Sequence, residues 1–157
     1  MCIRDRTRNW WHSAWKAGFF NDHFRKPMNP ASYTGGCLCG HIRFIANGPP
    51  QNPHACSCEF CQRHAGAPSL CWVEFAKDDV AWTGPGGEPS RYRSSDYSSR
   101  SFCPRCGSTL GAIDDGPVVA LVTGSFDIRD DPALKPSSHA FADLCPTWHP
   151  VAGYTGQ

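Results

Sequence analysis

Hydrophobic and polar residues alternate in short runs along residues 28–157, and glycine, proline or serine interrupts each run. Residues 41–46 place alternate apolar side chains on one face, as in a half-buried strand. Residues 69–75 set Val73 and Phe75 on one face and Trp72 on the other. The same reasoning predicts further strands over residues 79–83, 90–94, 97–102, 108–113 and 117–123.

Turn-forming residues separate these predicted strands. Gly48-Pro49-Pro50 and Pro53 are expected to break the chain after the first strand. Asp114-Asp115-Gly116 predicts a hairpin between the last two strands. The best helix candidate is a short turn near residues 60–64, and the chain from Gly124 onward reads as irregular. Regular short strands with turn signals favour a mainly β protein of one domain.

Composition divides the 157 residues into two unequal parts. Residues 1–27 carry six Lys or Arg against two Asp, whereas residues 28–157 carry nine basic and twelve acidic residues. Residues 1–27 have three interpretations. They are a targeting segment, an appended helix, or a translated adapter or upstream sequence ahead of a natural start at Met28. We expect the last of these, and therefore a single domain over residues 28–157 with its core over residues 33–149.

The charge and hydropathy of the domain exclude two classes of partner. Residues 28–157 have a formal net charge of −3, which argues against a nucleic-acid surface. No apolar run approaches the roughly 18 residues that cross a bilayer. We therefore expect neither a nucleic acid nor a membrane as partner, and a cytoplasmic protein.

Seven of the ten cysteines lie in three tight motifs. The motifs are Cys37-Leu38-Cys39-Gly40, Cys56-Ser57-Cys58-Glu59-Phe60-Cys61 and Cys103-Pro104-Arg105-Cys106-Gly107. Disulfides are the alternative to metal binding, but no secretory signal is visible and cysteines within C-x-C are too close for unstrained disulfide geometry. The spacing therefore favours metal, since two cysteines of one turn can span an edge of a zinc tetrahedron.

Two of the motifs together provide four thiols for a closed zinc site: Cys37, Cys39, Cys103 and Cys106. Glycine after the second cysteine, at Gly40 and Gly107, permits a positive φ. The trio of Cys56, Cys58 and Cys61 then provides three thiols and an open position, as in a catalytic zinc site. The alternative is a closed second site whose fourth ligand is one of Cys71, Cys145, His54 or His64. Spacing alone also permits the first two motifs to pair with each other.

The order of the motifs resembles the domain shared by the glutathione-dependent formaldehyde-activating enzymes and centromere protein V. Four segments carry the resemblance: Gly36-Cys37-Leu38-Cys39-Gly40, Cys56-Ser57-Cys58-Glu59-Phe60-Cys61-Gln62-Arg63, Arg100-Ser101-Phe102-Cys103-Pro104-Arg105-Cys106-Gly107-Ser108 and Gly124-Ser125-Phe126-Asp127. The resemblance implies a zinc-stabilised β-tent fold of small antiparallel sheets. It also implies a structural zinc on Cys37, Cys39, Cys103 and Cys106 and a functional zinc on Cys56, Cys58 and Cys61.

The same resemblance implies an enzyme that joins or splits a thiol and a small carbonyl compound. This carbon–sulfur lyase would act like an S-(hydroxymethyl)glutathione synthase, on glutathione and formaldehyde. The thiolate is the nucleophile in such chemistry, so the trio is the predicted catalytic centre. Arg63 and His64 follow the trio and are expected to bind a carboxylate of the thiol substrate. The alternative is a non-catalytic zinc-binding interaction module, and Cys2, Cys71 and Cys145 have no predicted role in either.

Overall fold

The computed structural model describes residues 32–149, so the extension of residues 1–27 and the predicted start at Met28 lie outside the described residues. The described chain is mainly β, with one short α-helix, α2 (Glu59–Ala65). Its strands are β1 (Ser32–Gly36), β2 (Arg43–Asn47), β3 (Gln51–Cys56), β4 (Leu70–Ala76), β5 (Val80–Trp82), β6 (Ser90–Arg93), β7 (Ser98–Phe102), β8 (Thr109–Asp114), β9 (Val118–Val122) and β10 (Ser138–Ala140). Short 3-10 helices are η2 (Lys77–Asp79), η3 (Thr123–Ser125), η4 (Pro132–Leu134) and η5 (Ala142–Leu144).

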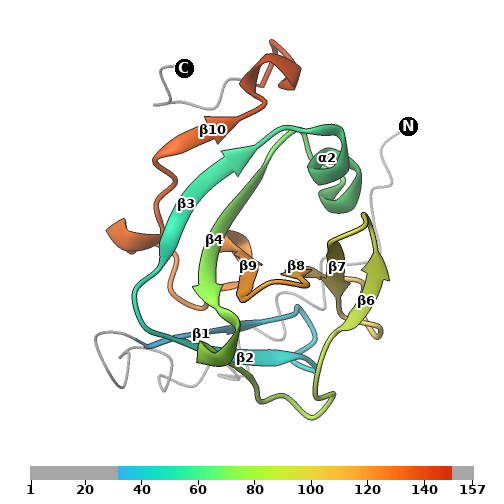
Figure 1. The fold of residues 1–157 in the computed structure, drawn as a ribbon, viewed down its shortest axis with the longest axis vertical. Coiled ribbons are helices and arrows are strands. Elements are labelled where there is room, and N and C mark those ends of the chain that lie inside the picture. Colours follow the sequence, from blue (N-terminus) through green and yellow to red (C-terminus); the bar gives the residue numbers. More distant parts are fainter. Residues whose placement is uncertain (1–31, 150–157) are drawn as a thin grey trace, which may run out of the picture.

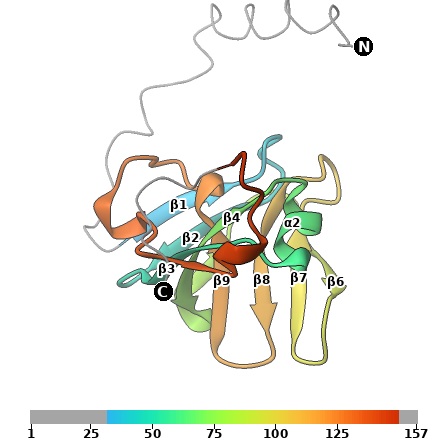
Figure 2. The same cartoon turned by 90° about the horizontal axis from the view of Figure 1, so that it is seen from above.

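The strands form two sheets within one domain (Figure 1). The small sheet has the order β1-β2-β5, and the large sheet has the order β10-β3-β4-β9-β8-β7-β6. Neighbouring strands pair antiparallel, except that β10 pairs parallel to β3. Figure 2 shows β9, β8, β7 and β6 side by side, with α2 near one end of β7 and β6.

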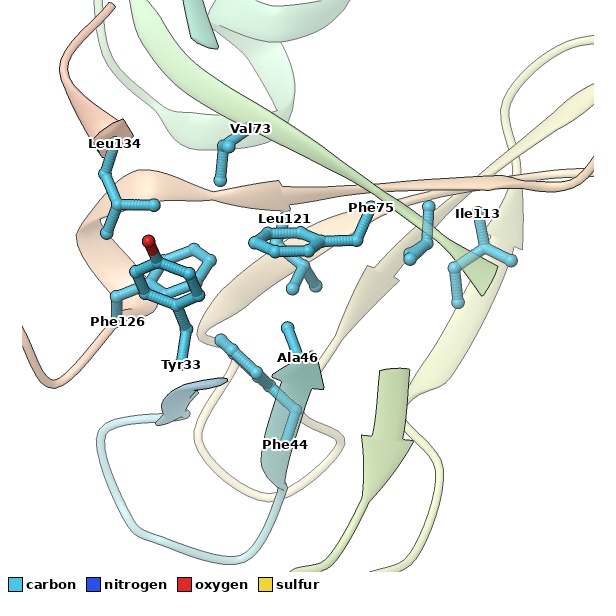
Figure 3. Close-up of a cluster of buried hydrophobic side chains, with 10 residues drawn as sticks. Tyr33, Phe44, Ala46, Val73, Phe75, Ile113, Leu121, Phe126 and Leu134 are labelled. Carbon is cyan, nitrogen blue, oxygen red and sulfur yellow. The ribbon is translucent and has the colours of Figure 1, made fainter. Parts of the chain in front are cut away.

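The main hydrophobic core lies between the small sheet and one face of the large sheet (Figure 3). Phe44 of β2 contributes a ring that packs edge-on against Phe126, with ring centroids 5.1 Å apart. Val73 and Phe75 of β4 and Leu121 of β9 are at most 1% exposed. The alternation predicted for residues 69–75 is thus confirmed, because Val73 and Phe75 enter this core whereas Trp72 joins a separate cluster.

Two segments differ from the sequence-based expectation. Pro53 does not break the chain, because β3 runs through it with an irregular register between Gln51 and His54. An irregularity of this kind accommodates a proline, which cannot donate to the ladder. The region after Gly124 is not wholly irregular either, since β10 pairs with β3 at the edge of the large sheet. Three residues are too few for a periodic pattern, so β10 has no signal of its own in the sequence.

Candidate metal centre and adjoining cavity

Four thiols gather where the loop after β1 meets the loop after β7. The Sγ atoms of Cys37, Cys39, Cys103 and Cys106 all lie within 4.8 Å of one another. The Sγ atoms of Cys37 and Cys39 are 3.6 Å apart, and those of Cys39 and Cys103 are 3.8 Å apart. Four sulfurs at such distances match the donor set and spacing of a closed tetrahedral zinc site. The structure therefore brings together the four residues that the sequence predicts for one site.

The backbone around these four thiols directs N–H groups at sulfur. Gly40 has φ 73° and Gly107 has φ 74°, and nothing lies within 4 Å of a Cβ built on either, so conformation rather than space requires glycine there. The N–H of Ile42 donates to Cys37 Sγ over 3.2 Å.

Burial opposes ionisation of Cys106, but hydrogen bonds from Ser108 and from Cys39 together outweigh it and lower the pKa of Cys106 to about 5. The His41 N–H lowers the pKa of Cys39, but burial and hydrogen bonds to the other three thiols raise it to about 11. Without metal, the group therefore favours a thiolate at Cys106 and a thiol at Cys39, and the thiolate is the form that binds metal.

The trio of Cys56, Cys58 and Cys61 lies between the end of β3 and the first turn of α2. The three Sγ atoms lie within 4.8 Å of one another. Cys56 and Cys61 are buried, and Cys58 is half-buried. Within residues 32–149, the group that could hold a metal here consists of these three sulfurs. None of the four candidate fourth ligands belongs to it, which supports the open arrangement.

Protons are unevenly shared within the trio. The hydrogen bond from the Cys61 thiol lowers the pKa of Cys56 to about 5. The same hydrogen bond, together with burial, raises the pKa of Cys61. A divalent cation bound to three thiols would take the place of these protons, because metal-coordinated thiols are deprotonated. The donor set of the trio therefore fits zinc.

Residues 139–144 contact the loop that carries the trio. The Ser57 hydroxyl lies 2.8 Å from His139 Nε2, and the Ser57 N–H donates to the carbonyl of Ala140 over 3.0 Å. The side-chain amide of Gln62 donates to the carbonyls of Ser57 and Leu144. These contacts fix the loop from both sides, as outer-shell partners of metal ligands do.

A cavity of about 470 Å³ opens beside the trio. The trio forms one part of its lining, and the outer face of the large sheet forms another. Trp72 is 2% exposed and packs in one apolar cluster with Cys56, Cys61 and Ala112. A cavity of this size suits a small organic ligand. Its charged or titratable side chains, apart from the thiols, are His54, Glu74, Tyr97, Arg100 and Asp114.

The side chains of Arg100 and His64 both lie against the Trp72 ring. The guanidinium carbon of Arg100 lies 5.2 Å from the centroid of the Trp72 ring. The His64 ring lies nearly parallel to Trp72, at 9°, with centroids 6.5 Å apart. Burial and the nearby Arg100 charge lower the pKa of His64. Neutral His64 is therefore a weak candidate for direct pairing with a carboxylate at neutral pH, and Arg100 is a strong one.

The two substrate-binding residues predicted from sequence line a neighbouring cavity of about 450 Å³. Arg63 is 79% exposed at its side chain and forms an ion pair with Glu59 one turn earlier in α2. Arg63 and His64 are absent from the lining of the cavity that holds the trio, whereas Arg100 lines both cavities. Sequence reasoning gave Arg100 no role, because the surrounding Ser98-Ser99-Arg100-Ser101 has no apolar face to orient it.

Both thiol groups lie in the part of the chain that matches a known family. The sequence model described as glutathione-dependent formaldehyde-activating enzyme (GFA) matches residues 32–143, a stretch that contains all seven clustered cysteines. The chain belongs to the GFA family. The family and the mainly β fold, both predicted from sequence, are confirmed, and the two thiol groups have the composition and spacing to hold metal ions.

Two individual proteins are similar to this GFA-family chain. An uncharacterized lyase of Schizosaccharomyces pombe is 32% identical over 80 residues, which cover 50% of this chain and 55% of that protein. The match thus spans about half the length of that relative. A crystal structure of a Rhodobacter sphaeroides protein aligns with TM-score 0.49 and 16% identity, over 63% of this chain and 91% of that one. Within residues 32–149, each helix is too short or too polar to cross a bilayer.

Proposed function

We propose that this GFA-family protein is a zinc-dependent carbon–sulfur lyase that acts on the adduct of a small thiol with formaldehyde. The observation that carries the proposal is the trio of buried or half-buried thiols that opens on a cavity. Three protein ligands and one free position are the arrangement of catalytic zinc. The family description and the lyase name of the S. pombe relative support the same class of reaction.

The reaction adds a thiol across the carbonyl group of formaldehyde. A bond forms between the thiol sulfur and the carbonyl carbon, and the thiol proton ends on the oxygen as a hydroxyl group. In the lyase direction the carbon–sulfur bond breaks, the carbonyl is restored, and the hydroxyl proton returns to sulfur. No other oxidant, reductant or co-reactant is needed.

Each part of the chain has a distinct task in this proposal. Zinc held by Cys56, Cys58 and Cys61 would supply a Lewis acid that stabilises a thiolate at neutral pH. Trp72 and the apolar side chains around it exclude water from one side of the cavity, which strengthens electrostatic interactions there. The four-thiol group would hold a second zinc with a structural task, because its four thiols complete a tetrahedral ligand set.

Metal analysis and formaldehyde exchange test the proposal together. The protein is expected to carry two zinc per chain and to speed the exchange of ¹³C-formaldehyde between its free and glutathione-bound forms above the spontaneous rate. Cys58→Ser is expected to remain folded, to lose one zinc and to abolish the acceleration. Cys145→Ser is the matched control, because Cys145 Sγ donates to the His149 carbonyl and a serine hydroxyl can do the same. A two-zinc protein that leaves the exchange rate of every thiol unchanged would instead be a non-catalytic zinc module.

A further inference from the structure

A row of directly paired residues crosses the cavity face of the large sheet. Glu74 of β4 pairs with Ala120 of β9, and Ala120 pairs with Ala112 of β8. Ala112 in turn pairs with Arg100 of β7. Directly paired residues point to the same face of a sheet, and all four line the cavity that holds the trio.

Glu74 and Arg100 place opposite charges at the two ends of this row, and the two side chains between them are small. Three strand spacings of about 4.8 Å separate Glu74 from Arg100, or roughly 14 Å between their backbones. Ala112 and Ala120 project only a methyl group between them, and both line the cavity. The two alanines pack in the same apolar cluster as Cys56 and Cys61, which places the thiols beside this row.

Arg100 has a charge that no described carboxylate neutralises. Within residues 32–149, the ion pairs of arginine belong to Arg43, Arg63, Arg91 and Arg93. Asp114 is diagonal to Arg100 across β7 and β8, but the two form no ion pair within that range. The Arg100 Nε atom is buried without a hydrogen-bond partner, and its guanidinium lies over Trp72. An arginine held in this way is prepared to bind an incoming carboxylate.

Glu74 is held in place at the other end of the row. The side-chain amide of Asn52 donates to Glu74 Oε1 over 2.7 Å. Asn52 has φ 44°, a left-handed conformation that few residues other than glycine and asparagine adopt readily. The irregularity in β3 therefore turns Asn52 toward Glu74, and the second carboxylate oxygen of Glu74 has no partner among the described contacts.

We propose that Arg100 and Glu74 are specificity-determining residues that bind, respectively, a carboxylate and an ammonium group at opposite ends of a peptide-sized thiol ligand. This assignment rests on the proposed function, because it orients the thiol of the ligand toward the trio. A tripeptide spans about 10 Å when extended, which suits a row of this length once both side chains lean inward. Free cysteine carries both charges on one α-carbon and cannot reach both residues.

Binding of analogues that lack a free thiol tests recognition apart from the chemistry. The probes are S-methylglutathione, its C-terminal amide and its N-acetyl derivative, measured by calorimetry on the zinc-loaded protein. The wild type is expected to bind S-methylglutathione about tenfold or more tightly than either derivative. Arg100→Gln is expected to bind S-methylglutathione as weakly as the wild type binds the C-terminal amide. This variant should no longer discriminate between S-methylglutathione and the amide, but should still discriminate against the N-acetyl derivative. Glu74→Gln, which keeps an acceptor for Asn52, is expected to lose discrimination against the N-acetyl derivative alone.

Controls separate a failure of recognition from a failure of catalysis. Arg100→Lys retains the charge and is expected to recover part of the discrimination, while Arg91→Gln is a matched control because Arg91 pairs with Glu88 outside the cavity. The assignment is overturned if the wild type does not bind S-methylglutathione, or if both Gln variants discriminate among the probes as the wild type does. Intact discrimination without accelerated formaldehyde exchange would remove the proposed function and leave the recognition residues assigned.

Discussion

The Ser57 hydroxyl lies 2.8 Å from Nε2 of His139, although 82 positions separate the two residues in the sequence. Ser57 is fully buried and stands between two members of the trio, Cys56 and Cys58. The contact therefore connects the proposed functional metal site to β10, the edge strand of the large sheet. A ligand loop fixed by a distant segment can keep its geometry when substrate enters the open position.

Replacing His139 is expected to weaken zinc binding at the trio without unfolding the domain. His139→Ala removes the hydrogen bond to Ser57. Because Ser57 adjoins two proposed ligands without being one, we expect a loss of metal affinity of about tenfold, at the low end of the range for direct partners of ligands. Competition with a chromophoric chelator measures the affinity of each site. The more weakly bound zinc is expected to be released earlier, while the four-thiol site is unchanged. Ser137→Ala is the control, since Ser137 belongs to the same segment but bonds to the Pro53 carbonyl; equal zinc affinity in the two variants would contradict the expectation.

The two thiol groups are expected to differ in their effect on stability. Cys103→Ser removes a buried ligand of the closed site, where metal binding contributes on the order of 10 kcal/mol to folding. This variant should lose cooperative thermal unfolding, as followed by circular dichroism. Cys58→Ser should unfold cooperatively, because its group is proposed to bind substrate rather than to hold the fold. Similar unfolding of both variants would show that the two sites are structurally equivalent.

Phe141 provides a test of backbone strain at the rim of the cavity. It has φ 54° and ψ 42° and lines the cavity that holds the trio. A left-handed conformation costs a non-glycine residue about 1 to 2 kcal/mol. Phe141→Gly is therefore expected to have a free energy of unfolding higher than that of Phe141→Ala by about 1 kcal/mol. Urea denaturation measures both variants, which lack the same ring, and equal stabilities would show that the conformation is unstrained.

Cys71 is expected to be slow to alkylate at neutral pH. Burial raises the pKa of Cys71 above its ordinary value of 9.0, so the thiol of the folded protein stays protonated to a higher pH than that of the unfolded chain. The contribution of the protonated Cys71 thiol to the free energy of unfolding is therefore complete below pH 9.0 and is lost as the pH rises above that value. Iodoacetamide labelling followed by mass spectrometry, in the zinc-loaded and the urea-unfolded protein, compares the two states. Equal labelling rates at pH 8 would contradict the expectation.

The features that were predictable from the sequence are those that local residues determine. The alternation around Val73 fixes the two faces of β4, and Gly40 and Gly107 mark the two turns that present thiols. The helix near residues 60–64 is confirmed as α2. In each case the pattern that carries the information is shorter than about ten residues.

The features that were not predictable depend on contacts between distant segments. β10 is short, and its place beside β3 is set by pairing with the strand that leads to the trio. Arg100 stands among serines, so only the register of β7 on β8 assigns it to the cavity face. A single-residue shift of that register would turn Arg100 to the opposite face. Arg63, in contrast, is adjacent to the trio in sequence, yet α2 directs it to the neighbouring cavity.

The parallel pairing of β10 with β3 also sets an order of events during synthesis. The four-thiol group has all its ligands once Cys106 has left the ribosome, because its members lie between residues 37 and 106. The loop of the trio is complete earlier in the chain, but His139 and Ala140, which hold it, are made about 80 residues later. A nascent chain can therefore close its proposed structural metal site first and fix the geometry of its proposed reactive site only as the later part of the domain emerges.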